Sequence, residues 1–233
     1  MNPVSSHPVP TPPNSQEPAR LLELISVEAR KRGGVEGEAA LEHGSLLARF
    51  LTILRQENQR MNLVSSRAAE PEELVRRHLF DSLFGLRFLP SAIPKRAFRL
   101  LDLGSGGGFP ALPLLIVRPD IEGTLVDSTE KKCAFLRHAV GDLGLTAQVL
   151  NARFPSSFPM KTIAPFDLLT TRAVNAAGVL VRDARPIFLG KALLWTTEGL
   201  WREAARESRL PRAAFHLATG AESRGIAVLE CST

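Results

Sequence analysis

The segment of this chain that is best suited to chemistry is a glycine-rich turn. An apolar run over residues 98–103 contains Asp102 near its end and is followed by Gly104, Gly106 and Gly108. Glycine tolerates a left-handed backbone and leaves no Cβ between the chain and a ligand. The turn therefore predicts a strand–turn–helix unit in which a small molecule closely approaches the backbone.

An acid further along the chain indicates the class of ligand. A second apolar run, residues 121–126, ends at Asp127, about twenty positions after Gly104, where an acid accepts hydrogen bonds from ribose hydroxyls. A dinucleotide-binding turn needs a small residue where Phe109 stands, and no Lys-Ser or Lys-Thr follows the glycines as in a phosphate-binding loop. The pattern favours S-adenosylmethionine as the cofactor, with Asp102, Gly104, Gly106, Gly108 and Asp127 in its site.

Transfer of a methyl group from this cofactor needs few protein groups. The reaction is an in-line displacement for which the cofactor supplies the leaving group. An acceptor nitrogen with a free lone pair needs no base, so alignment and the removal of water suffice. The five histidines show no metal-ligand spacing, and we expect Cys133 to be a buried thiol. Residues 170–173 lack the Asn-Pro-Pro-Tyr-like turn that grips exocyclic amines, which argues against acceptors of that kind.

Apolar runs that alternate with helical segments predict the fold that positions these residues. Strands that alternate with helices form βαβ units and a parallel sheet. We therefore expect an α/β protein with a Rossmann-like, mostly parallel sheet, closed by an antiparallel pair at its end. The expected parallel strands are residues 98–103, 121–126, 146–150, 166–170 and 192–195, and the closing pair is 212–217 with 225–231.

The residues before the first strand predict a helical cap. Six prolines and several serines in residues 1–19 indicate a disordered tail. A first helix should stop at Gly33-Gly34, a second should run over 45–60 with an apolar stripe, and a third should begin at Pro71. We predict a disordered tail at 1–19, a cap at 20–97 and a methyltransferase domain at 98–233.

Charge and composition favour an anionic partner. The formal charge is +5, and residues 49–99 carry ten basic and five acidic side chains, an excess that equals the whole net charge. This segment is either an RNA-binding surface or an ordinary solvated helical surface. No apolar run reaches the length of a membrane span, no secretory signal is present, and the two cysteines fit neither a disulfide framework nor a metal site. We expect a cytoplasmic protein, a monomer rather than an oligomer, without membrane or metal.

Taken in order, the motifs of this chain resemble those of the RsmG or GidB methyltransferases, which modify guanine N7 in small-subunit (16S) ribosomal RNA. The resemblance runs from about Phe50 to Thr196, with a weaker echo at residues 224–230. Its markers are Met61-Asn62-Leu63 before Arg67, Arg77-His78 with Asp81-Ser82, Leu101–Pro110, Leu125–Ser128 with Lys131-Lys132 and Phe135-Leu136, and Thr171–Ala173.

The resemblance implies roles for particular positions. Gly104 and Phe109 match contacts to the cofactor, Ala152 and Arg153 match the pair beside its adenine ring, and Arg172 matches an arginine at the mouth of the site. Arg172 is thus a positioning candidate for cofactor or RNA, unless it forms only a surface ion pair. The cap positions that match RNA contacts, or else internal hydrogen bonds, are Asn62, Arg67, Arg77 and His78.

Three departures from the family pattern keep other functions open. Arg153 stands where the family usually has an acid, Ala111 replaces a glycine, and no Lys-Gly pair follows the fifth strand. Besides ribosomal RNA or the small subunit, the acceptor could therefore be a protein or a small molecule. A third possibility is a protein that binds cofactor or RNA without transferring methyl.

Overall fold

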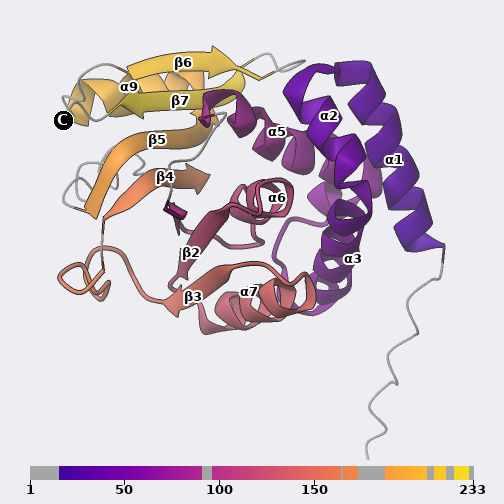
Figure 1. The fold of residues 1–233 in the computed structure, drawn as a ribbon, viewed down its shortest axis with the longest axis horizontal. Coiled ribbons are helices and arrows are strands. Elements are labelled where there is room, and N and C mark those ends of the chain that lie inside the picture. Colours follow the sequence, from indigo (N-terminus) through magenta and orange to yellow (C-terminus); the bar gives the residue numbers. More distant parts are fainter. Residues whose placement is uncertain are drawn as a thin grey trace, which may run out of the picture.

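The fold is a seven-stranded sheet with helices on both faces (Figure 1). A computed structural model describes residues 16–90, 96–163, 165–172, 187–208, 213–218 and 223–230. The strands are β1 Phe98–Leu103, β2 Ile121–Asp127, β3 Ala147–Asn151, β4 Phe166–Arg172, β5 Phe188–Thr197, β6 Ala213–Leu217 and β7 Arg224–Glu230.

The strand order confirms the predicted fold class. It is β3-β2-β1-β4-β5-β7-β6, with β1 to β5 parallel and β7 antiparallel to both β5 and β6. The order reverses between β1 and β4, and in open α/β sheets a ligand binds at the carboxyl ends of the strands beside such a point. The expected closing pair is present, although residues 212 and 231 lie outside the described residues.

Both faces of the sheet are buried, which explains why its central strands read as continuous apolar runs. In β1, Leu100 packs into the core shared with the cap, whereas Leu101 and Leu103 pack into the core on the opposite face. The opposite face is covered by α9 Glu198–Ser208, through Trp201, and by the segment that follows β3, through Phe158.

The residues before β1 form several helices at one side of the sheet (Figure 1). They are α1 Glu17–Arg32, α2 Gly34–Glu42, α3 Gly44–Met61, the 3₁₀ turn Arg67–Ala69, α4 Pro71–Glu73, the π-helical turn Leu74–Leu79, α5 Phe80–Leu83 and the 3₁₀ turn Phe84–Phe88. α1 ends at Arg32 and is capped by Gly33, which has a φ of 62°, so the helix stops where predicted. The expected tail boundary at residue 19 is wrong, because α1 already begins at Glu17, with proline tolerated in its first turn. The third predicted helix is also interrupted, since its middle turn is π-helical.

The cap and the sheet share one hydrophobic core. α3 contacts α6 (Ala111–Val117) and α7 (Glu130–Asp142), both of which cover the same face of the sheet. Phe50 of α3 and Phe80 of α5 are fully buried in that core, together with Leu112 of α6. This packing holds the cap residues in place over the carboxyl ends of the strands. The division into cap and sheet domains remains a prediction.

Candidate functional site

The glycine turn is fixed against β2 by hydrogen bonds of its own backbone. Gly104, Gly106 and Gly108 have φ values of 77°, 51° and 87°, a region in which residues with a Cβ are strained. The N–H groups of Gly104 and Ser105 both donate to the carbonyl of Val126, at 2.8 and 3.0 Å. The buried Ser105 hydroxyl accepts from the Val126 N–H and donates to the Asp102 carbonyl, so it joins β1, the turn and β2.

Asp127 is held at the end of β2 by two backbone donors. Its Oδ2 accepts from the Gly106 N–H at 3.0 Å and its Oδ1 accepts from the Thr129 N–H at 2.8 Å. The residue is only 7% exposed, so its carboxylate is fixed in one orientation. Each carboxylate oxygen can accept a further hydrogen bond, which leaves capacity for the hydroxyls of a ligand.

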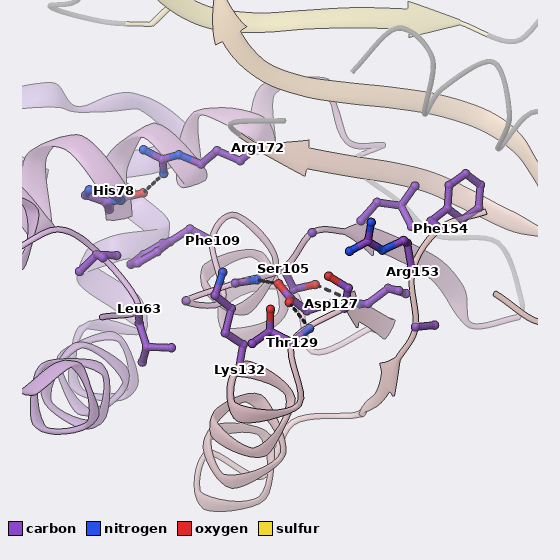
Figure 2. A pocket seen from close by; sticks show the side chains of 18 residues that line it. Leu63, His78, Ser105, Phe109, Asp127, Thr129, Lys132, Arg153, Phe154 and Arg172 are labelled. Atoms are coloured by element: carbon purple, nitrogen blue, oxygen red, sulfur yellow. Dashed lines mark hydrogen bonds between the residues drawn. The ribbon is translucent and has the colours of Figure 1, made fainter. Parts of the chain in front are cut away.

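Asp127 and the glycine turn meet in a first cavity of about 500 Å³ (Figure 2). Lys132, from α7, and Arg153, from the segment after β3, both extend into this space. The walls are partly apolar and partly charged. They comprise Leu63, Val64, His78, Leu103, Gly104, Ser105, Gly106, Gly107, Phe109, Val126, Asp127, Ser128, Thr129, Lys132, Ala152, Arg153, Phe154 and Arg172.

Most of the predicted cofactor residues line this first cavity: Gly104, Gly106, Phe109, Asp127, Ala152, Arg153 and Arg172. Asp102 and Gly108 do not line it, and direct binding of the cofactor by these two residues remains a prediction. Asp102 is buried beneath the turn, where its Oδ1 accepts a 2.6 Å hydrogen bond from the Thr170 hydroxyl and its Oδ2 has no partner among the described residues. Burial raises the pKa of this carboxyl to about 7.

Gly108 serves the packing of the turn rather than its ligand surface. A Cβ at this position would lie 2.5 Å from Leu112 Cδ1 and 3.4 Å from Phe50 Cε2. Both neighbours belong to the core that the cap and the sheet share. Gly108 therefore allows α3 and α6 to pack tightly against the turn.

Arg172 connects the end of β4 with the cap. Its guanidinium donates to the carbonyls of Arg77 at 2.7 Å and His78 at 3.4 Å, the second of which Figure 2 shows. It also lies 5.9 Å from the centre of the Phe109 ring. Arg172 is thus built into the wall of the cavity and is more than a surface ion pair.

His78 forms a neutral part of the same wall. Its ring lies 5.2 Å from the ring of Phe109, as Figure 2 shows on the cap side of the cavity. Burial first, and then the positive charges of Arg172, Arg224 and Arg77, together lower the pKa of His78 to about 3. A neutral imidazole fits an apolar contact with a ligand better than a role as a proton donor near neutral pH.

The other predicted RNA residues do not gather at this cavity. Asn62 ends α3 with a φ of 50° and lines a separate polar cavity of the cap. Arg67 is exposed and its side chain has no partner among the described residues. Arg77 is exposed and pairs with Glu73 at 2.8 Å. Only His78 of the four reaches the first cavity, and their binding to RNA remains a prediction.

The structure also reduces the free charge of the basic segment at residues 49–99. Half of its ten basic side chains form ion pairs with acids, most of which lie outside the segment. The pairs are Arg49–Asp142, Arg55–Glu17, Arg77–Glu73, Arg87–Glu36 and Arg96–Asp167. Three of these pairs join helices that precede β1, and the other two join this segment to α7 and β4. Lys95 lies outside the described residues.

Several wall residues escaped the sequence analysis. Lys132 had a signal, since it follows Asp127 in one of the motifs, and Ser105 and Gly107 lie inside the glycine turn. Leu63 also stands in one of the motifs, whereas Val64 had no signal, because it comes from the cap, some forty positions earlier in the chain, and only folding places it beside the turn.

Comparison with known proteins gives a consistent picture. Residues 44–216 match the family model described as GidB: rRNA small subunit methyltransferase G. The chain is 40% identical over 163 residues to the Ribosomal RNA small subunit methyltransferase G of Acidiphilium cryptum, a match that covers 70% of each chain. It is 34% identical to the protein of that name from Methylobacillus flagellatus, covering 71% of this chain and 72% of the relative. For the relative from Chromobacterium violaceum, which is 40% identical, the match spans 63% of its length.

Solved structures agree with the fold at low sequence identity. An S-adenosylmethionine-dependent O-methyltransferase of Thermotoga maritima has a TM-score of 0.52 at 14% identity and covers 77% of this chain and 72% of its own. A methyltransferase of Aquifex aeolicus with the same cofactor dependence has a TM-score of 0.51 at 13% identity, with 65% and 90% covered. Within the described residues, no helix is both long enough and apolar enough to cross a membrane.

Proposed function

We propose that this chain, which belongs to the GidB family of rRNA small subunit methyltransferase G proteins, transfers a methyl group from S-adenosylmethionine to guanine N7 in the RNA of the small ribosomal subunit. One observation carries the proposal: the glycine turn and Asp127 line one cavity inside the stretch that matches the family. The proposed substrate places the reaction in the cytoplasm.

The residues of the first cavity fit this cofactor. Asp127 is a fixed carboxylate that can still accept hydrogen bonds from two ribose hydroxyls. Ala152 and Phe154 offer apolar contacts for a purine ring, and the exposed backbone of Gly104 can approach a ligand without a side chain in the way. The volume of about 500 Å³ is in the usual range for a small-molecule site.

The cofactor would supply an activated methyl group and its leaving group, which leaves binding and alignment to the protein. Phe109 and the neutral ring of His78 form an apolar wall that excludes water. Arg172 is held by two carbonyls of the cap, so it stays at the boundary between the cavity and the end of β4. Because guanine N7 carries a free lone pair, no side chain needs to remove a proton.

Cations of the first cavity and of the cap are available for RNA phosphates. Lys132 and Arg153 line the cavity, and Arg60 and Arg67 on the cap have no ion pair among the described residues. Phosphate contacts of this kind give affinity that depends on salt and carry no sequence information. Arg153, which replaces the family's usual acid, would in this proposal add a phosphate contact rather than a hydrogen-bond acceptor for adenine.

This chain has an acid after β5, where the family usually has a Lys-Gly pair. Glu198 and Gly199 follow β5 here, and Glu198 begins α9 and forms an ion pair with Arg202 at 2.6 Å. An acid at this position would repel a nearby phosphate. We therefore propose that phosphate contacts come from the cap and the Lys132 side of the cavity instead.

The test is methyl transfer from labelled S-adenosylmethionine to small ribosomal subunits that lack the family's modification. The product is mapped by chemical cleavage at 7-methylguanine. One new cleavage in the small-subunit RNA is expected. Label that appears in protein, or that survives nuclease treatment, would instead favour a protein or metabolite acceptor. Cofactor binding without any transfer would favour a non-catalytic relative.

A further inference from the structure

A second cavity lies beside the first at the carboxyl end of the sheet. It has a volume of about 320 Å³ and is lined by residues that include Trp195 and Thr197 of β5, Arg224 and Ile226 of β7, and Asp81 of α5. Arg172 lines both cavities, so they are neighbours across one side chain. The second cavity is therefore next to the proposed methyl donor, on the side of β4 and β5.

Asp81 is the acidic group of this second cavity. Its Oδ2 accepts a hydrogen bond from Arg224 at 2.9 Å and lies 3.7 Å from the guanidinium of Arg172. Its main-chain carbonyl accepts from the Trp195 indole at 2.6 Å, which fixes the residue on the end of β5. Oδ1 receives no hydrogen bond from the described residues, and the residue is only 6% exposed. Oδ1 is thus available to a ligand, and Oδ2 can accept a second hydrogen bond beside the one from Arg224.

The charges around Asp81 do not fully compensate for its burial. Burial raises the pKa of the Asp81 carboxyl above its ordinary value, although Arg172, Arg224, Arg32 and Arg77 all lower it. A ligand that donates hydrogen bonds to this carboxylate would replace part of the hydration that burial removed. Donor groups of a ligand therefore suit Asp81, and an acceptor suits Arg224.

The remaining walls suit a flat, partly apolar ligand. Trp195 and Ile226 are buried on the inner side, and Leu200 of α9, which is half exposed, stands at the rim. Apolar walls with a few polar groups are typical of small-molecule sites, and nucleobases stack on such surfaces.

Among the four bases, guanine matches the polar groups best. Its Watson–Crick edge presents an acceptor, O6, followed by two donors, N1–H and the N2 amino group. An arginine beside a carboxylate offers the complementary order. Adenine and cytosine present a ring-nitrogen acceptor at the middle position, which a carboxylate repels, and uracil lacks the second donor. N7 does not belong to this edge, so it stays free for the reaction.

We infer that the second cavity receives the acceptor guanine by its Watson–Crick edge, with Asp81 accepting from N1–H and the N2 amino group and Arg224 donating to O6. The inference rests on the proposed function, since it names how that reaction selects its base. A base that is read on this edge must be unpaired, so the target guanine is turned out of any helix before it is methylated. Asp81 is thereby the residue that determines base specificity.

The test uses nucleotides as competitors and as direct ligands. Inosine monophosphate lacks only the N2 amino group of guanosine monophosphate, so the ratio of their affinities reports one hydrogen bond to Asp81. We expect guanosine monophosphate to inhibit methyl transfer competitively with the subunits and inosine monophosphate to inhibit roughly tenfold more weakly. Titration of both nucleotides into protein that carries S-adenosylhomocysteine should give the same ratio without any turnover.

Variants separate base recognition from a structural role. Asp81→Asn should remove the preference for guanosine over inosine monophosphate while the affinity for S-adenosylmethionine is unchanged. Arg224→Gln keeps Asp81 and removes the donor to O6, so it should weaken both nucleotides equally and preserve their ratio. Glu230→Gln, at the other end of β7, is the matched control and should change neither.

Three results would each overturn the inference. The unaltered protein could bind the two nucleotides equally, it could bind neither at millimolar concentration, or Asp81→Asn could leave the ratio of their affinities unchanged. If Asp81→Asn does not fold, the unaltered protein and Arg224→Gln still decide the question. If methyl is transferred to the subunits but guanosine monophosphate is not preferred over inosine monophosphate, the inference is wrong and the proposed reaction stands. A guanosine preference without transfer to subunits would defeat the proposed reaction and leave the cavity assignment standing.

Discussion

Replacement of Asp127 by asparagine is the sharpest test of the proposed cofactor site. In the structure both carboxylate oxygens accept backbone hydrogen bonds, from Gly106 and Thr129, at 3.0 and 2.8 Å. An asparagine must therefore turn its amide NH₂ toward one of these N–H groups, and it also loses the charge that ribose hydroxyls would meet. Hydrogen bonds to a charged group contribute about 1.5–3 kcal/mol each, so we expect a loss of about 3 kcal/mol, roughly a hundredfold in Kd.

Isothermal titration of S-adenosylmethionine into both proteins measures this loss. Thermal unfolding beside it verifies that Asp127→Asn is folded at the temperature of the titration. Asp120→Asn is the matched control, because Asp120 is an exposed acid before the start of β2 whose one ion-pair partner among the described residues is Arg118. A cofactor analogue without the two ribose hydroxyls should bind both proteins equally. If Asp127→Asn changes the Kd by less than threefold, or weakens the analogue as much as the cofactor, the carboxylate does not hold the ribose.

Three further predictions concern groups of the same site. Asp102→Asn should flatten the pH dependence of stability. The folded-state pKa of Asp102, about 7, exceeds the unfolded value, so the protonated carboxyl stabilises the folded protein below about pH 4. This contribution to the free energy of unfolding, up to about 4 kcal/mol, is lost as the pH rises to 7. Denaturant unfolding across that range checks it, and equal slopes in both proteins would contradict the buried carboxyl. The ring of His78, with a pKa of about 3, should show the NMR shifts of a neutral imidazole throughout about pH 5 to 8, and a titration in that range would mean that the ring is not buried. Gly108→Ala should destabilise the protein by about 1–3 kcal/mol in denaturant unfolding, because its φ of 87° and the contact with Leu112 both oppose a Cβ; a stability within 0.5 kcal/mol of the unaltered protein would refute this reading.

The local pattern of the chain was enough to predict the strands, their mostly parallel pairing and the turn between β1 and α6. Continuous apolar runs that alternate with helical segments leave little choice but a parallel sheet, because each run must be covered on both faces. The glycine turn and Asp127 follow the same logic, since consecutive parallel strands bring their carboxyl ends to one edge of the sheet. The motif alone did not show which of its residues line the cavity: Asp102 is hydrogen-bonded to Thr170 beneath the turn, and Gly108 packs against Leu112.

Charge was the least reliable guide. An excess of basic residues in the segment 49–99 indicated a surface for RNA, but side chains such as Arg49 and Arg96 join this segment to acids on α7 and β4. Composition counts charges without their partners, and partners that are far apart in sequence meet only in the folded chain. The phosphate-binding surface therefore has to be sought among cations such as Arg60 and Arg67, which have no ion pair among the described residues.

The sequence by itself determined the class of this protein, because the spacing of glycines and acid on strand, turn and strand is a local property that few folds share. Only the tertiary structure decided what stands opposite that turn. Packing of the cap through Phe50 and Phe80 brings His78 and Asp81 to the ends of β4 and β5, where Arg172 joins them. These contacts link residues some ninety positions apart, and their existence depends on how two apolar surfaces fit together, which no local pattern records.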